Sequence, residues 1–319
     1  MFLVTGAAGF IGFHVASRLL DQGIDVLGVD TLNSYYDPAL KQARLQRLED
    51  RRGFVFSRCD IADHAALTEA VAGAGLTHII HLAAQAGVRY SLEAPFAYER
   101  ANVAGHLSVL ELARNTKSLK HLVYASSSSV YGDRSDGPFR ETDRCDAPRS
   151  LYAATKRACE LMSETYAHLY GIQQTGLRFF TVYGPWGRPD MAYWRFAENI
   201  LKGEPITLYD EGALERDFTY IDDVAPILVK IAAAAPPEAH SIFNIGNSKP
   251  TTVSHLVDVL ERAAGRPAIR HYAPAPKTEV ASTFADHTRA SVQFGFAPRT
   301  TIDEGAPEFV RWYRDFYRR

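Results

Sequence analysis

Residues 2–12 read FLVTGAAGFIG, and this stretch decides the fold class. The apolar run Phe2 to Val4 predicts a buried strand, and the amphipathic stretch Ile11 to Leu20 predicts a helix. Three glycines with the spacing G-x-x-G-x-x-G stand between them. A glycine-rich turn that joins a strand to a helix in this way is typical of a parallel α/β sheet that binds a dinucleotide.

Each glycine of this turn has a predicted role. Gly6 permits the tight turn, Gly9 lets the backbone approach a pyrophosphate, and Gly12 lets the helix pack close to the strand. The phosphates then meet backbone N–H groups at the helix N-terminus, where Phe10 and Ile11 stand. The alternative is a glycine-rich loop without special meaning, and the strand–turn–helix context argues against it.

Short apolar runs alternate with amphipathic stretches through the first half of the chain. The runs predict strands at 2–4, 25–29, 54–56, 78–82, 121–125 and 175–179. The stretches predict helices at 11–20, 39–48, 65–71, 96–113 and 152–170. This alternation predicts the α/β class, with a Rossmann-type doubly wound parallel sheet and helices on both of its faces.

The alternation ends near Phe180, where Gly and Pro become frequent. Further helices are expected at 224–234, 253–264 and 304–316, and a strand at 242–245. We therefore expect a dinucleotide-binding domain at 1–180, which also receives segments near 215–247, and a smaller mixed α/β lobe at 181–319.

The composition is that of a soluble globular enzyme, with 46% hydrophobic and 23% charged residues. The net charge of -2 gives no reason to expect nucleic acid or a membrane surface as a partner. Cys59, Cys145 and Cys159 lie far apart without a CxxC motif, so we expect no metal site, no disulfide framework and a cytoplasmic location. The start of the chain leaves no room for a signal peptide, and no apolar run reaches the ~18 residues of a membrane helix.

Asp30 ends the second predicted strand, 18 residues after Gly12. An acidic residue at this distance holds the adenosine ribose diol, and its charge repels a 2′-phosphate. Since no Arg follows directly, the sequence favours NAD over NADP. A solvated carboxylate at a strand end is the alternative.

Other strand ends add expected cofactor contacts. Asp60 and Ile61 follow the third strand and are expected to flank the adenine. After the fourth strand come residues that let the cofactor lie against them, namely Leu82, Ala83 and Ala84. Asn102 is expected to support the sheet end near the cofactor, with an ordinary Asn on a helix surface as the alternative.

Tyr152 and Lys156 form the pattern Y-x-x-x-K on a predicted helix. Positions i and i+4 share one helix face, so the Lys156 ammonium lies beside the phenol and favours the phenolate. Such a tyrosine can take a proton from a hydroxyl group near neutral pH. An exposed Tyr–Lys pair is the alternative. The fifth strand ends in the hydroxyl-rich run 126–129, which can hydrogen-bond a sugar oxygen.

These motifs resemble the extended short-chain dehydrogenase/reductase family, close to its UDP-galactose and UDP-glucuronate 4-epimerases. The resemblance covers nearly the whole chain and rests on the glycine-rich turn, HLAAQ at 81–85, the serine run with VYG at 130–132, and Tyr152 with Lys156. It implies that Ser127 completes a catalytic triad and that the enzyme recycles one tightly bound NAD. It also implies oxidation of the sugar at C4, rotation of the 4-keto sugar, and reduction from the opposite face.

The serine run helps to distinguish between the different reactions that members of this family catalyse. Family dehydratases carry an acidic pair beside the catalytic Ser or Thr, and UDP-glucuronate decarboxylases usually carry a Glu in the same loop. This chain has Ser128 and Ser129 there, which favours epimerisation. A dehydratase or decarboxylase, a UDP-glucose/UDP-galactose 4-epimerase of relaxed specificity, and a non-catalytic NAD-binding regulator stay as alternatives.

The string WGRPDMA at 186–192 is similar to that of uronate 4-epimerases and favours UDP-glucuronic acid as the substrate. Its C6 carboxylate needs hydrogen-bond donors, which Ser128, Ser129, Thr181 and Arg188 supply. A 4-keto uronate is a β-keto acid that can lose CO₂, and donors that hold the carboxylate suppress this loss. The alternative for Arg188 is a loop cation paired with Asp190.

The segment RDFTYIDD at 216–223 also matches the family. By this resemblance Arg216 binds the diphosphate, residues Thr207 to Tyr209 lie near the uracil, and Arg89 is a further substrate contact. Glu279 is expected at the uridine ribose and Lys277 at a phosphate, although PKTEV at 276–280 departs from the usual family pattern. Three acids are expected to be structural, with Asp222 a helix N-cap: Asp217, Asp222 and Asp223.

The resemblance further implies a homodimer. Helices 96–113 and 152–170 carry apolar residues on more than one side, and the family pairs them with the same helices of a second subunit. A monomer in which these helices are fully buried is the alternative.

Overall fold

The computed structural model describes residues 1–134, 136–276 and 280–318. Its contacts group the chain into two compact units. The first unit consists of Met1–Val130, Cys145–Arg178 and Ala225–Phe243, and the second of Tyr131–Arg144, Phe179–Val224 and Asn244–Arg319. The sequence led us to expect a division near residue 180, with segments near 215–247 returning to the first part. The contacts place 225–243 in the first unit, and they also place 131–144 in the second, which was not expected.

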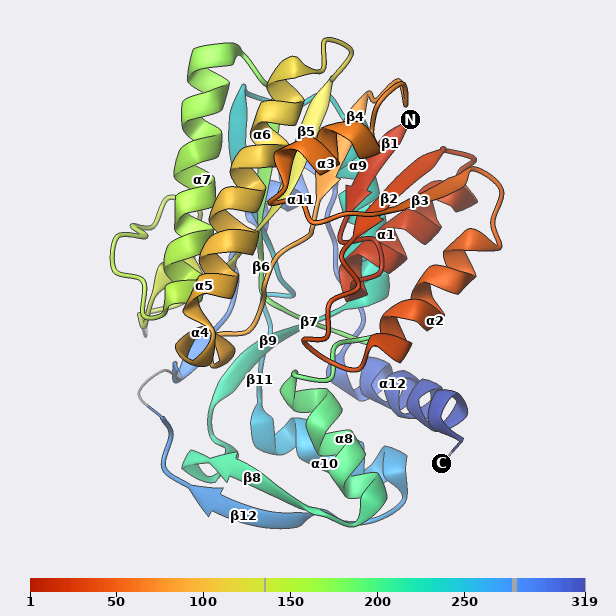
Figure 1. The fold of residues 1–319 in the computed structure, drawn as a ribbon. Helices are drawn as coiled ribbons and strands as arrows, with labels where there is room; N and C mark the ends of the chain where they lie inside the picture. The colour runs from red at the N-terminus through yellow and green to blue at the C-terminus, as the bar shows by residue number, and fades with distance from the viewer. Residues whose placement is uncertain (135, 277–279, 319) are drawn as a thin grey trace. The chain divides into compact units, whose positions relative to one another are not determined.

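The first unit is built on a seven-stranded sheet with the order β10-β6-β5-β4-β1-β2-β3 (Figure 1). The strands are β1 (Phe2–Thr5), β2 (Val26–Asp30), β3 (Phe54–Arg58), β4 (His78–His81), β5 (His121–Ser127), β6 (Gln174–Phe179) and β10 (His240–Ile245). Neighbouring strands from β3 to β5 pair in parallel. The strand order reverses between β1 and β4, and ligands of such sheets bind at the carboxyl ends of the strands beside this point.

Helices cover this sheet. They are α1 (Phe10–Asp21), α2 (Pro38–Glu49), α3 (His64–Ala70), α4 (Tyr90–Glu93), α5 (Pro95–Tyr98), α6 (Gly105–Asn115), α7 (Leu151–Tyr170) and α9 (Ile221–Ala233). Helix α6 lies between α3 and α7, and α1 packs against α2 (Figure 1). Leu3, Ile79 and Leu122 of the strands pack with Val109 and Leu110 of α6 in a buried core. Within the described residues, no helix is long and apolar enough to cross a membrane.

Two details of the predicted helices are wrong. The stretch 96–113 is not one helix, because the π-helix η1 (Glu99–Ala104) separates α5 from α6. Apolar periodicity cannot reveal a widened turn of this kind, which is frequent at functional sites. Asp222 is not an N-cap, because α9 already begins at Ile221 and Asp222 lies in its first turn.

The second unit contains two small sheets. In one, β9 (Glu215–Tyr220) pairs with β7 (Thr181–Tyr183), β11 (Pro250–Thr252) and β13 (Ser282–Thr283). In the other, β8 (Pro205–Tyr209) pairs in parallel with β12 (Ile269–Ala273). The α-helices are α8 (Ala192–Lys202), α10 (Val253–Ala264), α11 (Thr288–Phe294) and α12 (Ile302–Tyr317), and α10 packs against both α8 and α12. Single turns of 3₁₀-helix, η2 (Ser128–Tyr131) and η3 (Asp210–Gly212), complete the chain's elements.

Asp217 holds the loops of the second unit together. Its fully buried carboxylate accepts hydrogen bonds from the backbone N–H groups of Asn247, Ser248 and Ala285. Burial raises the pKa of Asp217, and these hydrogen bonds oppose that shift. Asp223 similarly accepts from the N–H groups that precede α12, at Arg299 and Thr300. Both contacts give these acids the structural role expected of them.

The first unit contains two buried histidines that lie side by side, His81 of β4 and His106 of α6. The rings of His81 and His106 stack with their centroids 5.2 Å apart. His81 Nδ1 lies 2.7 Å from Thr5 Oγ1, and His106 Nε2 lies 2.9 Å from Ser163 Oγ. Burial lowers the pKa of His106 to about 3, and the nearby charge of Lys156 acts in the same direction. Both rings are therefore neutral at physiological pH.

A neutral buried histidine makes stability depend on pH. Between pH 6.5 and about 3 the unfolded chain protonates His106 and the folded chain does not, so stability falls as the pH is lowered through this range. We expect His106→Gln to reduce the slope of unfolding free energy against pH by about 1.4 kcal/mol per pH unit between pH 6 and 5. Urea unfolding at several pH values measures the slope. The exposed His168→Gln is the control, and equal slopes for all three proteins would contradict the expectation.

Candidate active site

The glycine-rich turn is as closely packed as its spacing predicts. Gly6 has φ +72°, and a Cβ there would lie 2.8 Å from Ala83 N in the loop after β4. A Cβ on Gly12 would lie 2.0 Å from Gly6 O, so only glycine lets α1 start this close to the turn. Gly9 is the N-cap of α1 and has no capping side chain, which leaves the first N–H groups of the helix for a ligand.

Asp30 lies at the carboxyl end of β2 beside this turn. Its Oδ2 accepts a hydrogen bond from Ala8 N at 3.2 Å, and its Oδ1 accepts one from Leu32 N at 2.8 Å. A fixed carboxylate next to a phosphate-binding turn is the arrangement that holds the ribose of a dinucleotide. The turn and Asp30 together fit NAD.

The sequence analysis missed a cation at this turn. Arg44 of α2 is fully buried, and its Nη1 donates hydrogen bonds to Ala8 O and to the Tyr36 hydroxyl at 3.0 and 2.7 Å. Lys41, one turn earlier, donates to Asn33 O at 2.9 Å. Their spacing places both on one face of α2, which was the available signal. Arg44 therefore ties α2 to the backbone of the glycine-rich turn.

The remaining predicted cofactor residues lie at neighbouring strand ends. Asp60 accepts from Ala62 N at 3.0 Å and forms an exposed ion pair with Arg100 at 2.8 Å. Ile61 is buried against the backbone of Gly105, where no Cβ would fit. Leu82, Ala83 and Ala84 follow β4. The first two lie next to β1, because Leu82 N donates to Thr5 O and Ala83 N donates to Thr5 Oγ1, both at 3.2 Å.

Asn102 is not an ordinary residue on a helix surface, because it is 2% exposed. It lies in the π-helix η1, where its Oδ1 accepts from Gln85 N at 2.8 Å. Its Nδ2 donates to Gln85 O and to Thr155 Oγ1, both at 3.0 Å. The side-chain hydrogen bonds of Asn102 thus reach the loop after β4 and α7, so it positions these two segments.

Helix α7 presents the Y-x-x-x-K pair. Ser150 caps the helix by accepting from Ala153 N at 3.1 Å, which places Tyr152 in the first turn. Lys156 is buried one turn later, and its Nζ donates to Ala125 O of β5 at 2.9 Å. The ring of Tyr98 meets the Tyr152 ring edge-on at 6.1 Å.

Ser127 ends β5 and directly precedes the serine-rich turn η2. Its Oγ accepts from Ser129 N at 3.2 Å and lies 3.2 Å from Ser129 Oγ. Ser128 and Ser129 both belong to η2, so the structure brings the three serines together. Because Lys156 bonds Ala125 two residues earlier, α7 and the end of β5 are adjacent.

Glu160, which the sequence analysis missed, fixes this arrangement. Its buried carboxylate accepts from Ser126 Oγ at 2.6 Å, from Arg178 Nε at 2.8 Å and from Arg157 Nη1 at 2.8 Å. Burial alone would raise the pKa of Glu160, but the hydrogen bonds and the Arg178 charge outweigh it and lower the pKa. The i, i+4 spacing from Lys156 was the signal that could have revealed it.

The other predicted substrate residues lie as follows. Thr181 starts β7, and Thr207 and Tyr209 lie on the more exposed side of β8. Arg216 of β9 donates through Nη1 to Glu215 O and Val280 O at 2.7 Å. Arg188 pairs with Asp190, as its alternative interpretation predicted. Arg89 precedes α4 of the first unit, and Glu279 and Lys277 lie outside the described residues.

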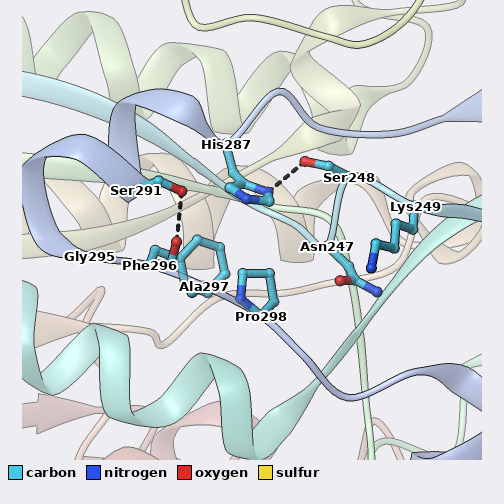
Figure 2. A pocket seen from close by; sticks show the side chains of 9 residues that line it. All are labelled: Asn247, Ser248, Lys249, His287, Ser291, Gly295, Phe296, Ala297 and Pro298. Carbon is cyan, nitrogen blue, oxygen red and sulfur yellow. Dashed lines mark hydrogen bonds between the residues drawn. The ribbon is translucent and has the colours of Figure 1, made fainter.

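The second unit also contains a pocket of about 480 Å³ (Figure 2). His287 and Ser291 lie on one side of it and Lys249 on another, with the His287 ring hydrogen-bonded to Ser248. Its lining residues are Asn247, Ser248, Lys249, His287, Ser291, Gly295, Phe296, Ala297 and Pro298. None of the predicted substrate residues is among them, so this pocket is not the predicted sugar site.

Comparison with known proteins identifies the class to which this fold and site belong. Residues 2–246 match the NAD dependent epimerase/dehydratase family. The chain belongs to this family, and the predicted family and α/β fold class are confirmed.

Individual relatives show which members of this family the chain is similar to. The chain is 45% identical to a probable UDP-glucuronate 4-epimerase of Rhizobium meliloti, over 100% of this chain and 98% of that protein. It is 46% identical to UDP-glucuronate 4-epimerase 1 of Arabidopsis thaliana, over 99% of this chain and 77% of that protein. Among solved structures, it is similar to UDP-glucuronic acid 4-epimerase from Bacillus cereus in complex with UDP-glucuronic acid and NAD. That match has a TM-score of 0.92 and 32% identity, and it covers 99% of each chain.

Proposed function

We propose that this chain is an NAD-dependent isomerase that converts UDP-glucuronic acid to UDP-galacturonic acid by inversion at C4. The observation that carries the proposal is the placement of Tyr152 and Lys156 of α7 beside a strand end that offers only serine hydroxyls. The similarity to UDP-glucuronate 4-epimerases over the whole chain supports the same substrate.

The first unit binds NAD and the second binds the nucleotide sugar. The turn with Gly6, Gly9 and Gly12 receives the pyrophosphate, and Asp30 receives the adenosine ribose. Phe10 and Ile11 stand at the helix N-terminus that meets the phosphates. The other residues of the proposed NAD site are Asp60, Ile61, Leu82, Ala83, Ala84, Asn102, Tyr152 and Lys156. NAD supplies the group that takes a hydride from C4 and gives it back to the opposite face.

Three side chains move the proton. Tyr152 takes the proton of the sugar 4-hydroxyl during oxidation and returns it after the 4-keto sugar has rotated. Lys156, held by Ala125 O, supplies the positive charge that stabilises the tyrosine oxygen. Ser127 hydrogen-bonds the same sugar oxygen. Since hydride and proton both return, NAD is not consumed.

The C6 carboxylate distinguishes the proposed substrate from neutral hexoses. Neutral donors from Ser128, Ser129 and Thr181 hold it, together with the Arg188 guanidinium. These donors keep the carboxylate from the orientation in which the β-keto acid intermediate loses CO₂. Arg216 binds the diphosphate, and the uridine and remaining substrate contacts come from Thr207, Tyr209, Arg89 and Glu279.

The active form is a homodimer in the cytoplasm. Exposed apolar side chains on α6 and α7 support the dimer, namely Leu107, Leu161, Leu169 and Tyr170. Helices of a lone subunit seldom leave such a set in water, and a second copy covers it. Three buried free cysteines support a reducing compartment. Cell fractionation tests the location.

The product assay is the primary test. Purified protein is incubated with UDP-glucuronic acid, with and without added NAD, and the anomeric protons are followed by NMR. We expect UDP-galacturonic acid without net NADH, and a loss of about 10²-fold or more in kcat for Tyr152→Phe, because the proton acceptor is gone. Release of a UDP-pentose would favour a decarboxylase. Turnover of UDP-glucose alone would favour a neutral hexose epimerase.

Thr181→Val tests how the carboxylate is protected. The variant removes one donor without changing side-chain shape, so the 4-keto intermediate is held less firmly. We expect it to release CO₂ and a UDP-pentose product together with UDP-galacturonic acid, as measured by NMR and by CO₂ trapping. Thr165→Val, on the exposed side of α7, is the matched control. A Thr181→Val variant that releases no more pentose than the control would contradict this role.

The dimer is tested by light scattering. The wild type is expected to have twice the chain mass of 35.4 kDa. Leu161→Glu puts a charge on the α7 face and is expected to give monomers, whereas Val292→Glu on α11 leaves the dimer intact, although Val292 is also exposed. A monomeric wild type, or a dimeric Leu161→Glu, would rule out pairing through this face.

A further inference from the structure

The loop that carries Arg188 has a fixed conformation. Trp186 is a non-glycine residue with φ +60°, a conformation that persists only when its surroundings hold it. Its ring packs against Trp312 and Phe316 of α12, with centroids 5.1 and 5.0 Å away. A Cβ on the following Gly187 would lie 1.8 Å from the Tyr193 hydroxyl, so this residue is also closely packed.

Within this loop both carboxylate oxygens of Asp190 accept hydrogen bonds from Arg188. Arg188 Nε donates to Oδ1 at 3.1 Å, and Nη2 donates to Oδ2 at 2.9 Å. Nη2 also contacts Met191 Sδ at 3.4 Å. The two side chains are 25% and 23% exposed, so this is a partly buried fork rather than a loose surface pair. The guanidinium plane is therefore set before any ligand arrives.

We propose that Asp190 is a positioning residue that orients Arg188 for the sugar carboxylate and so sets the preference for a uronate over a neutral hexose. The inference rests on the proposed function, in which Arg188 contacts that carboxylate. Asp190 engages the Nε–Nη2 edge of the guanidinium, and a planar guanidinium can serve carboxylates on more than one edge.

Asp190 has two opposite effects on how strongly Arg188 binds a substrate carboxylate, and its effect on the orientation of Arg188 is the stronger one. The Asp190 charge weakens the attraction of Arg188 for a second carboxylate, but water screens this repulsion at a partly exposed pair. An unheld arginine must lose its rotamer freedom when it binds, whereas a held one has already lost it. Loss of Asp190 therefore weakens uronate binding.

The chain contains a matched control. Arg134 and Asp136 have the same R-x-D spacing and the same fork, with Nε–Oδ1 and Nη2–Oδ2 both at 2.9 Å. No substrate role is assigned to Arg134. Asp136 is more exposed than Asp190, and Arg134 also pairs with Asp143 at 3.1 Å. Asp136→Asn therefore controls for the loss of a forked carboxylate elsewhere in the chain, without touching the proposed carboxylate contact.

The experiment measures binding without turnover. Calorimetry on NAD-loaded Tyr152→Phe protein gives Kd for UDP-glucuronic acid, UDP-glucose and UDP. We expect Asp190→Asn to raise Kd for UDP-glucuronic acid about tenfold and to leave the other two within about twofold, because neither carries the carboxylate. Asp136→Asn is expected to change none of them. If Asp190→Asn does not fold, Asp190→Glu replaces it. The measured quantity is then the ratio of the Kd for UDP-glucuronic acid to the Kd for UDP-glucose.

An Arg188→Met background separates positioning from general structure. In that background Asp190→Asn is expected to leave the ratio of the Kd for UDP-glucuronic acid to the Kd for UDP-glucose unchanged, because the guanidinium that Asp190 orients is absent. Equal weakening of all three ligands, an unchanged ratio, or tighter uronate binding would each overturn the inference. A wild type that neither binds nor converts UDP-glucuronic acid would overturn the proposed function itself, whereas conversion with an unchanged ratio in Asp190→Asn overturns only the role of Asp190.

Discussion

The buried contact between Glu160 and Arg178 is the one on which the geometry of the side chains proposed for catalysis depends. It joins α7 to β6, and through the Ser126 hydroxyl it joins α7 to β5 as well. A buried carboxylate is tolerated only when its oxygens are saturated with donors, and here Arg178, Arg157 and Ser126 supply them. Since Lys156 binds the neighbouring carbonyl of β5 one helical turn earlier, the side chains proposed for catalysis are positioned by contacts that do not touch substrate.

A second constraint acts at the other end of the site. The glycine-rich turn touches the loop after β4 so closely that side chains are excluded, and the same loop is held by Asn102, which also reaches α7. The glycine-rich turn and α7 are thereby connected through the loop after β4 and Asn102. His81 and His106 are neutral, so they add no positive charge beside Lys156.

Local patterns in the sequence predicted the strands and most helices of the first unit, because side-chain period and glycine spacing are local properties. The family resemblance added the proposed triad. The errors share a different cause. The π-helix at 99–104 is too short for its wider turn to show in the apolar pattern, and the grouping of 131–144 with the second unit depends on distant contacts. Helical spacing could have drawn attention to Arg44 and Glu160, but their partners lie far away in the sequence, and spacing does not reveal them.

The interleaved units have a consequence for biosynthesis. The chain passes between the units after residues 130, 144, 178, 224 and 243, so neither unit is a continuous piece of the gene. The N-terminal unit lacks its edge strand β10 until residues near 240 have left the ribosome. Unlike a chain whose domains mature one after another, this protein must assemble both parts together near the end of translation. For the same reason the second unit cannot be exchanged between relatives as a single continuous segment.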